Sequence, residues 1–161
     1  MQFKKDGGKL DVYCDSDWAA DKVDQKSVSS VCVFYGVHLL KSVVSTQGII
    51  ALSSGEAEFI ASVKASSTSL GMHSLAADLG LTVTPRLHMD SSAAIGIYGR
   101  RGIGRIRHLH TPLLWVQERR AAKELETQKV PGELNPADLG TKELNFNVME
   151  KHLHRCGFRF M

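Results

Sequence analysis

Short stretches in which apolar and polar residues alternate are followed along the chain by longer stretches with helical spacing. Period-two alternation and β-branched residues predict strands over 10–15, 28–35, 37–45, 81–90 and 124–130. Helices are predicted over 53–79, 91–98 and 111–122, and another from 135 onward. Gly36 separates the second and third strands, which suits an antiparallel hairpin. Strands that alternate with helices favour an α/β fold with a mixed or largely parallel sheet.

The longest predicted helix has a clear start and a weak middle. Ser53 followed by Glu56 fits a capping box, in which Glu56 reaches back to the Ser53 amide. Residues 66–69 are Ser or Thr and Gly71 follows, so a kink or a break is expected there. Glu58 lies two positions after Glu56, and such residues point about 200° apart on a helix. Glu58 is therefore expected to face the sheet.

Four acidic residues stand at the edges of different predicted elements. Asp15 ends the first strand, Glu58 lies in the first turns of the long helix, and Asp90 closes the fourth strand. Asp138 follows Asn135, where the last helix is expected to begin. Strand ends and helix starts are where α/β folds gather their site residues. Carboxylates that converge repel one another unless cations lie between them, and oxygen ligands suit Mg²⁺ or Mn²⁺. The spacing indicates a metal-dependent phosphodiesterase.

Each acid also has an ordinary structural interpretation. Asp15 could be a solvated strand end, and Asp90 could cap the helix that follows it. Asp17 would share a strand face with Asp15 if the strand continued, which would make it an accessory ligand.

Five sequence motifs around these acids occur in the order found in a known family. The chain resembles the ribonuclease H domain of Ty1/copia-type LTR retrotransposon polyproteins over about residues 10–142. The motifs are Tyr13-Cys14-Asp15-Ser16-Asp17-Trp18-Ala19, Lys26-Ser27, Ala51-Leu52-Ser53-Ser54-Gly55-Glu56-Ala57-Glu58-Phe59-Ile60-Ala61, Asp90-Ser91-Ser92-Ala93-Ala94-Ile95 and Ala137-Asp138.

The resemblance implies a ribonuclease H-like fold, in which a five-stranded mixed sheet is flanked by helices. It implies that Asp15, Glu58, Asp90 and Asp138 are catalytic residues that hold two Mg²⁺ ions, with Mn²⁺ as a substitute. The expected reaction is two-metal hydrolysis of the RNA strand of an RNA–DNA hybrid, with Asp15 bridging both ions. The expected partner, besides the hybrid, is a reverse transcriptase domain upstream in the same polyprotein.

A basic segment follows the fourth strand and its short helix. Arg100, Arg101, Arg105 and Arg107 lie in a glycine-containing loop, and we expect them to contact nucleic-acid phosphates. The alternative is a solvated surface loop without a partner. The hydroxyl groups that are candidates for reading the RNA 2′-hydroxyls belong to Ser16, Ser91 and Ser92.

Length and composition limit the remaining possibilities. A chain of 161 residues with 43% hydrophobic and 23% charged residues is expected to form one domain, 1–161, with a C-terminal helical extension over 143–161. No apolar run is long enough to span a bilayer, and the first residues lack a signal-peptide core, so no membrane association is expected. Three cysteines, an odd number, indicate reduced thiols in an intracellular protein. The resemblance implies a cytoplasmic particle or the nucleus as its location.

Three other interpretations remain open at this stage. An integrase-type core is suggested by the 35 residues between Asp90 and Glu126, although Glu126 lies in a strand pattern. A degenerate, non-catalytic domain could instead brace a reverse transcriptase or bind nucleic acid. His152, His154 and Cys156 resemble part of a zinc site, but a fourth ligand is not evident and a packed helix is favoured.

Overall fold

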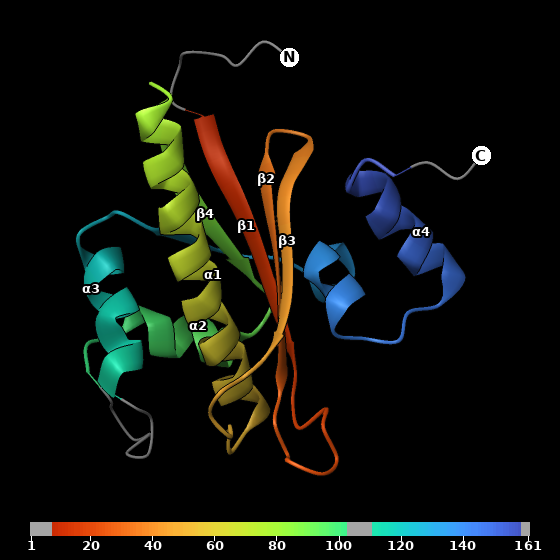
Figure 1. Ribbon diagram of the computed structural model, residues 1–161. Coiled ribbons are helices and arrows are strands. Elements are labelled where there is room, and N and C mark those ends of the chain that lie inside the picture. Colours follow the sequence, from red (N-terminus) through yellow and green to blue (C-terminus); the bar gives the residue numbers. More distant parts are fainter. Residues whose placement is uncertain (1–7, 103–110, 159–161) are drawn as a thin grey trace.

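One mixed sheet of five strands organises the molecule, in the order β3-β2-β1-β4-β5 (Figure 1). The computed structural model describes residues 8–102 and 111–158. Strand β1 pairs antiparallel with β2, and β2 with β3, whereas β1–β4 and β4–β5 are parallel. The strands are β1 (Gly8–Asp17), β2 (Val28–Tyr35), β3 (His38–Thr46), β4 (Val83–Met89) and β5 (Glu126–Lys129). The predicted five-stranded mixed sheet is confirmed.

Helices cover both faces of this sheet (Figure 1). On one side α1 packs on the sheet, with α2 and α3 beside it, and on the other side lie η3 and α4. The helical elements are α1 (Ser54–Asp78), α2 (Ser92–Gly99), α3 (Trp115–Ala121), α4 (Phe146–Arg155) and the 3-10 helices η1 (Thr111–Leu114), η2 (Gly132–Leu134) and η3 (Pro136–Gly140). The result is a three-layer α/β arrangement.

The alternation of β1 divides the core between the two faces. Val12 and Cys14 are buried in the larger apolar cluster, which includes Phe59 of α1. Tyr13 points the other way and belongs to a smaller cluster with Cys32 and Phe34. Because successive side chains of a strand alternate, Asp11 and Asp15 share the face of Tyr13. All three cysteines of the chain are free thiols, as expected.

Helix α1 is continuous from Ser54 to Asp78, so its weak middle does not split it into two helices. Its buried serines bond within the helix: Ser66 donates to the Ser62 carbonyl at 2.7 Å, and Ser69 donates to the Ser66 carbonyl at 2.8 Å. The Ser66 hydroxyl also lies 2.9 Å from the hydroxyl of Tyr98 in α2. These contacts satisfy the hydroxyl groups, and small side chains let α2 approach closely.

The helix expected from residue 135 is instead the short 3-10 helix η3, and α4 is a separate element. Asn135 explains where η3 begins and why it lies against β1. Its Oδ1 accepts a hydrogen bond from the Ala137 amide at 3.2 Å, and its Nδ2 donates to the Cys14 carbonyl at 2.9 Å. The buried Asn135 side chain therefore joins η3 to β1 near the edge where the acidic residues lie.

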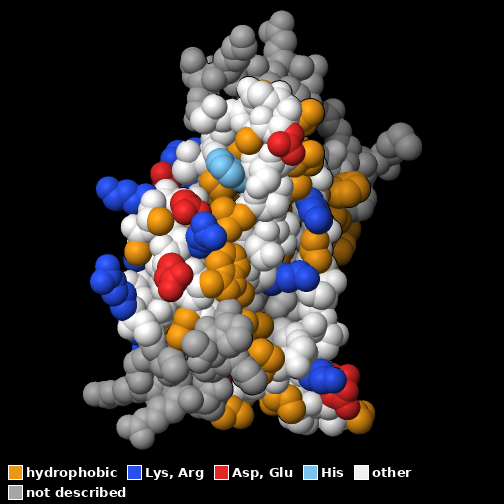
Figure 2. Space-filling view, turned by 60° about the vertical axis from the view of Figure 1, so that its left-hand side comes forward, with side chains coloured by type: hydrophobic (Ala, Val, Ile, Leu, Met, Phe, Trp, Pro, Cys, Tyr) orange, Lys and Arg blue, Asp and Glu red, His pale blue; other side chains and the backbone are white. Residues whose placement is uncertain are grey.

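The surface on the helix side keeps some apolar side chains exposed between Lys and Arg side chains (Figure 2). Leu75 and Leu79, at the end of α1, are 51% and 70% exposed. Scattered apolar side chains are ordinary on protein surfaces, so they carry no functional conclusion. None of the helices among the described residues has the length and apolarity that crossing a membrane requires.

Candidate active site

The acids named from the sequence come from three elements and one loop, and they meet at one edge of the sheet. Asp15 lies near the end of β1, and Asp90 directly follows the parallel neighbour β4. Asp138 is in η3, which Asn135 joins to β1. One carboxylate oxygen from each of Asp15, Asp90 and Asp138 lies within 4.8 Å of the others. Adjacent parallel strands end at the same edge, so the topology itself brings Asp15 and Asp90 together.

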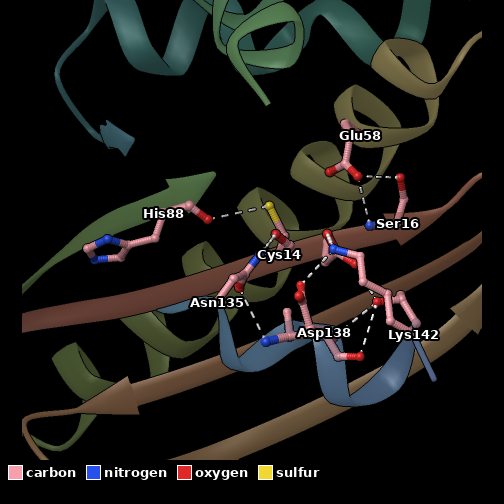
Figure 3. Close-up of polar contacts among 10 residues, drawn as sticks. Cys14, Ser16, Glu58, His88, Asn135, Asp138 and Lys142 are labelled. Atoms are coloured by element: carbon pink, nitrogen blue, oxygen red, sulfur yellow. Dashed lines mark hydrogen bonds and ion pairs between the residues drawn. The ribbon is translucent and has the colours of Figure 1, made fainter. Parts of the chain in front are cut away.

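Glu58 reaches this edge from α1 (Figure 3). Its Oε1 accepts hydrogen bonds from the Ser16 amide at 3.2 Å and from the Ser16 hydroxyl at 2.9 Å. Burial, then the nearby charge of Asp15 and that of Asp90, raise the pKa of Glu58 to about 8, against the opposing hydrogen bonds from Ser16. The expected orientation of Glu58 toward the sheet is therefore correct.

Glu56 has a structural role, but not quite the predicted one. The Ser53 hydroxyl accepts a hydrogen bond from the Glu56 amide at 3.3 Å, as in a capping box. The Glu56 carboxylate accepts from the Leu52 amide at 2.9 Å, whereas the prediction named the Ser53 amide. The return bond is thus shifted by one residue, and Glu56 still stabilises the loop before α1.

Asp15 is fully buried, and both of its carboxylate oxygens have partners from the turn after η3. The Thr141 hydroxyl donates to Oδ2, and the Lys142 ammonium donates to Oδ1 at 3.1 Å. Burial raises the pKa of Asp15 to about 6, and the charge of Asp138 adds to this effect, while Thr141 and Lys142 oppose it. Asp15 is therefore held in one orientation at an energetic cost for its charged form.

Lys142 joins two of the acids. Its Nζ lies 3.0 Å from Asp138 Oδ1 as well as 3.1 Å from Asp15 Oδ1 (Figure 3). Although burial lowers the pKa of Lys142, its contacts with Asp138 and Asp15 raise it well above its ordinary value. Neither Thr141 nor Lys142 was named from the sequence. The available signal was the spacing of Lys142 four residues after Asp138, which places the two on one side of a helical turn.

The serines expected to contact nucleic acid have partners within the protein. Ser16 is buried against Glu58, and the Ser91 hydroxyl accepts from the Ala94 amide at 3.2 Å as the N-cap of α2. The Ser92 hydroxyl lies at the exposed edge, 2.5 Å from the ammonium of Lys129. Ser16 follows Asp15 in the chain, and Ser91 and Ser92 follow Asp90. Their contact with nucleic acid stays a prediction.

The basic loop begins directly after α2. Arg101 is exposed, whereas Arg105 and Arg107 lie outside the described residues. Gln117 of α3 holds the start of the loop: its amide nitrogen donates to the Ile97 carbonyl at 2.8 Å, and its oxygen accepts from the Gly102 amide at 2.8 Å. These hydrogen bonds hold the backbone on both sides of Arg100 and Arg101 against α3.

Other sequence candidates do not join the acids. Glu126 lies at the start of β5, opposite Arg86, and its carboxylate pairs with Lys9 at 2.6 Å. The integrase-like spacing therefore has no counterpart in the site. In the part of the chain that the structure describes, His152, His154 and Cys156 do not form a group able to hold a metal ion. His152 is instead buried on α4.

The donors that converge are all carboxylate oxygens. Such hard oxygen ligands suit Mg²⁺ or Mn²⁺ rather than metals that prefer nitrogen or sulfur. The chemistry of Asp15, Glu58, Asp90 and Asp138 therefore fits the divalent cations that the resemblance implies.

Comparisons with known proteins agree with the fold and with the sequence motifs. No family model matches the chain. Its sequence is 26% identical over 160 residues to the Retrovirus-related Pol polyprotein from transposon RE1 of Arabidopsis thaliana, covering 96% of this chain and 11% of that protein. It is 26% identical over 140 residues to the Pol polyprotein from transposon TNT 1-94 of Nicotiana tabacum, covering 86% of this chain and 10% of that protein. The chain thus spans about a tenth of the length of these relatives.

Among solved structures, LC11-RNase H1, isolated from compost by a metagenomic approach, superposes with a TM-score of 0.54 at 16% identity. The match covers 81% of this chain and 90% of that one, and it establishes the fold alone. Sequence and structure therefore agree: the chain has the ribonuclease H-like fold and is similar to the ribonuclease H region of Ty1/copia-type retrotransposon Pol polyproteins.

Proposed function

We propose that this chain hydrolyses the RNA strand of RNA–DNA hybrids, as the ribonuclease H domain of a retrotransposon polyprotein during reverse transcription. The observation that carries the proposal is the convergence of Asp15, Asp90 and Asp138, whose oxygens lie within 4.8 Å of one another. The proposed cofactor is a pair of Mg²⁺ ions, which Mn²⁺ can replace. Asp15, Glu58, Asp90 and Asp138 would hold them.

Neighbouring side chains hold the carboxylates of this site in place for binding cations. Cations bound there would supply an activated water molecule and stabilise the leaving 3′-oxygen. Asp15 would hold the ions together with Asp138 and Glu58, which approach it from opposite faces of the sheet. Ser16 fixes the carboxylate of Glu58, and Thr141 fixes that of Asp15. Preorganised ligands of this kind avoid rearrangement during the reaction.

Substrate contacts are proposed around this edge. LC11-RNase H1, which shares the fold, has also been solved in complex with an RNA/DNA hybrid. In this chain Arg100, Arg101, Arg105 and Arg107 would contact phosphates, because phosphate contacts provide most of the affinity for nucleic acids. Ser16, Ser91, Ser92 and nearby amides remain the candidates for recognising the 2′-hydroxyl groups. A reverse transcriptase domain of the same polyprotein would supply the rest of the surface that binds the hybrid.

A labelled RNA–DNA hybrid provides the direct test. We expect cleavage of the RNA strand in Mg²⁺ and in Mn²⁺, none with a chelator, and none of duplex DNA or duplex RNA. Asp15→Asn is the matched inactive control, since it keeps the shape of the side chain and removes its charge. Metal-dependent cleavage of duplex DNA, or cleavage that persists in the chelator, would contradict the proposal.

The second candidate is a non-catalytic domain that braces a reverse transcriptase or binds nucleic acid. The observation in its favour is Lys142, because its ammonium already pairs with two of the four acids. The same assay separates the two functions. Binding of the hybrid without cleavage in either metal would favour the second candidate.

A further inference from the structure

The ammonium of Lys142 is built into the acidic cluster by the local backbone. The Lys142 amide donates to the Asp138 carbonyl at 2.9 Å, which closes the turn after η3. This turn places the Lys142 side chain on the same side as the Asp138 carboxylate, four residues earlier. Thr141, from the same turn, occupies the other oxygen of Asp15. The turn after η3 thus directs the Lys142 side chain toward the two acids.

The two oxygens that bind Lys142 are the ones a bridging cation would need. Nζ lies 3.1 Å from Asp15 Oδ1 and 3.0 Å from Asp138 Oδ1. A Mg²⁺ ion bound by both oxygens would lie about 2.0–2.1 Å from each and would occupy the same space. Two positive charges this close also repel, and the repulsion is strong where Asp15 is fully buried. The ammonium and a bridging cation therefore exclude each other.

In the absence of metal, a positive charge between Asp15 and Asp138 reduces the repulsion between their carboxylates. Asp15 is 0% exposed and Asp138 only 6% exposed, so water screens their repulsion poorly. The Lys142 side chain is 41% exposed and can turn outward to solvent without a large burial change. It is thus able both to neutralise the two acids and to leave them.

From this geometry we propose that Lys142 is an internal counter-ion that fills the position between Asp15 and Asp138 in the metal-free chain, and that a divalent cation must displace it to bridge these two carboxylates. The inference rests on the proposed function, since it concerns the same acids. It adds that the two cations bind unequally. The cation that bridges Asp15 and Asp138 must displace the ammonium, so it binds more weakly than the other.

Cation binding tests this directly, without reference to cleavage. Free Mn²⁺ is measured by electron paramagnetic resonance during a titration, and Mg²⁺ by competition. Lys142→Met keeps the length of the side chain and removes its charge, and we expect the weaker cation to bind roughly 5- to 150-fold more tightly, the usual range for coupled sites. The metal-free variant should also melt at a lower temperature and gain more from added Mn²⁺ than the unchanged protein.

Two controls isolate the position of the charge. Lys142→Arg keeps a positive charge at the site and should bind Mn²⁺ about as the unchanged protein does. Lys64→Met removes one charge from an exposed position on α1 and should leave both affinities unchanged. An equal gain in Lys64→Met would mean that net charge alone causes the effect, which would overturn the inference.

Other outcomes are equally decisive. Unchanged or weaker Mn²⁺ binding in Lys142→Met overturns the counter-ion role while leaving the proposed nuclease intact. Absence of Mn²⁺ binding in every variant overturns the proposed function and this inference together. If Lys142→Met does not fold, the ammonium signal of Lys142 in ¹⁵N NMR of the unchanged protein decides: it should shift as Mg²⁺ binds, and a constant signal overturns the inference.

Discussion

Two aspartates of strand β1, four residues apart and on the same face, have opposite electrostatic surroundings. Asp11 accepts hydrogen bonds from Arg86 and His88, each at 2.7 Å. Burial raises its pKa, but the bonds from His88 and Arg86 outweigh burial and lower the pKa of Asp11 to about 2. At Asp15 burial prevails over Thr141 and Lys142, and the pKa rises to about 6.

The difference lies in what shares each site. Asp11 has a guanidinium of its own from the neighbouring strand β4, because Asp11 and Arg86 are paired in the sheet register. Asp15 shares a single ammonium with Asp138 and lies near Glu58 and Asp90. The partners of Asp11 favour its charged form in the folded state, whereas an excess of buried like charges costs stability and creates a demand for cations. The same residue type is thus structural at one end of β1 and suited to metal chemistry at the other.

The largest contrast is expected from matched Asn variants of the two aspartates. Asp15→Asn should lower hybrid cleavage by orders of magnitude and leave the metal-free stability equal or higher, because it relieves repulsion. Asp11→Asn should retain cleavage and lose about 1–2 kcal/mol of unfolding free energy, because it removes the charge that Arg86 and His88 stabilise. Cleavage rates and chemical denaturation of both variants measure this. Near-normal cleavage by Asp15→Asn would remove Asp15 from the mechanism.

The two glutamates of α1 offer the next contrast. Glu58→Gln should lower the cleavage rate by orders of magnitude with little loss of stability, since Glu58 faces the acids. Glu56→Gln should change cleavage only slightly, because Gln can still accept the hydrogen bond from the Leu52 amide. Single-turnover rates in Mg²⁺ give the comparison. An inactive Glu56→Gln beside an active Glu58→Gln would reverse the assignment.

The stability of the fold should depend on pH in opposite ways at the Asp15 site and at the Asp11 site. Asp15 and Glu58 have pKa values raised to about 6 and about 8, so the folded state holds protons that the unfolded chain has lost. Their contribution to stability is greatest below pH 4 and is lost as the pH rises to 8, by roughly 7 kcal/mol in total. Asp11 acts in the opposite sense, because its pKa is lowered to about 2 and its contribution is lost as the pH falls from 3.8.

Denaturation of the metal-free chain between pH 4 and 8 measures this decline. The double variant Asp15→Asn with Glu58→Gln should flatten it, and saturating Mg²⁺ should reverse it. A stability that rises with pH across this range in the unchanged protein would show that the acids are not crowded as described.

The smallest effect is expected outside both aspartate sites. Replacing Arg100, Arg101, Arg105 and Arg107 with Gln should weaken hybrid binding and lower its salt dependence, by roughly 0.7–0.9 in the log–log slope for each phosphate that the loop no longer neutralises. Cleavage at saturating hybrid should change much less, which separates binding by the loop from chemistry at Asp15. Binding measured at several salt concentrations provides the test. An unaltered slope would mean that the loop is a solvated surface.

Local sequence patterns were enough to predict most of the elements and the identity of the acids. Alternation predicted β2 at its observed bounds, and Ser53 and Ser91 marked the starts of α1 and α2. The motifs placed Asp15, Glu58, Asp90 and Asp138 at element boundaries, and the observed topology brings them to one edge. These features depend on local spacing and local hydrogen bonds, which a linear pattern contains.

The surroundings of each acid depend on how distant parts of the chain pack together. The continuity of α1 depends on buried contacts such as that between Ser66 and Tyr98, and the position of η3 against β1 depends on the hydrogen bond from Asn135. Lys142 and Thr141 contact Asp15 across more than a hundred residues of sequence. Periodicity describes only neighbours along one element. Burial and charge pairing between distant elements, which set the contrast between Asp11 and Asp15, arise when the chain packs.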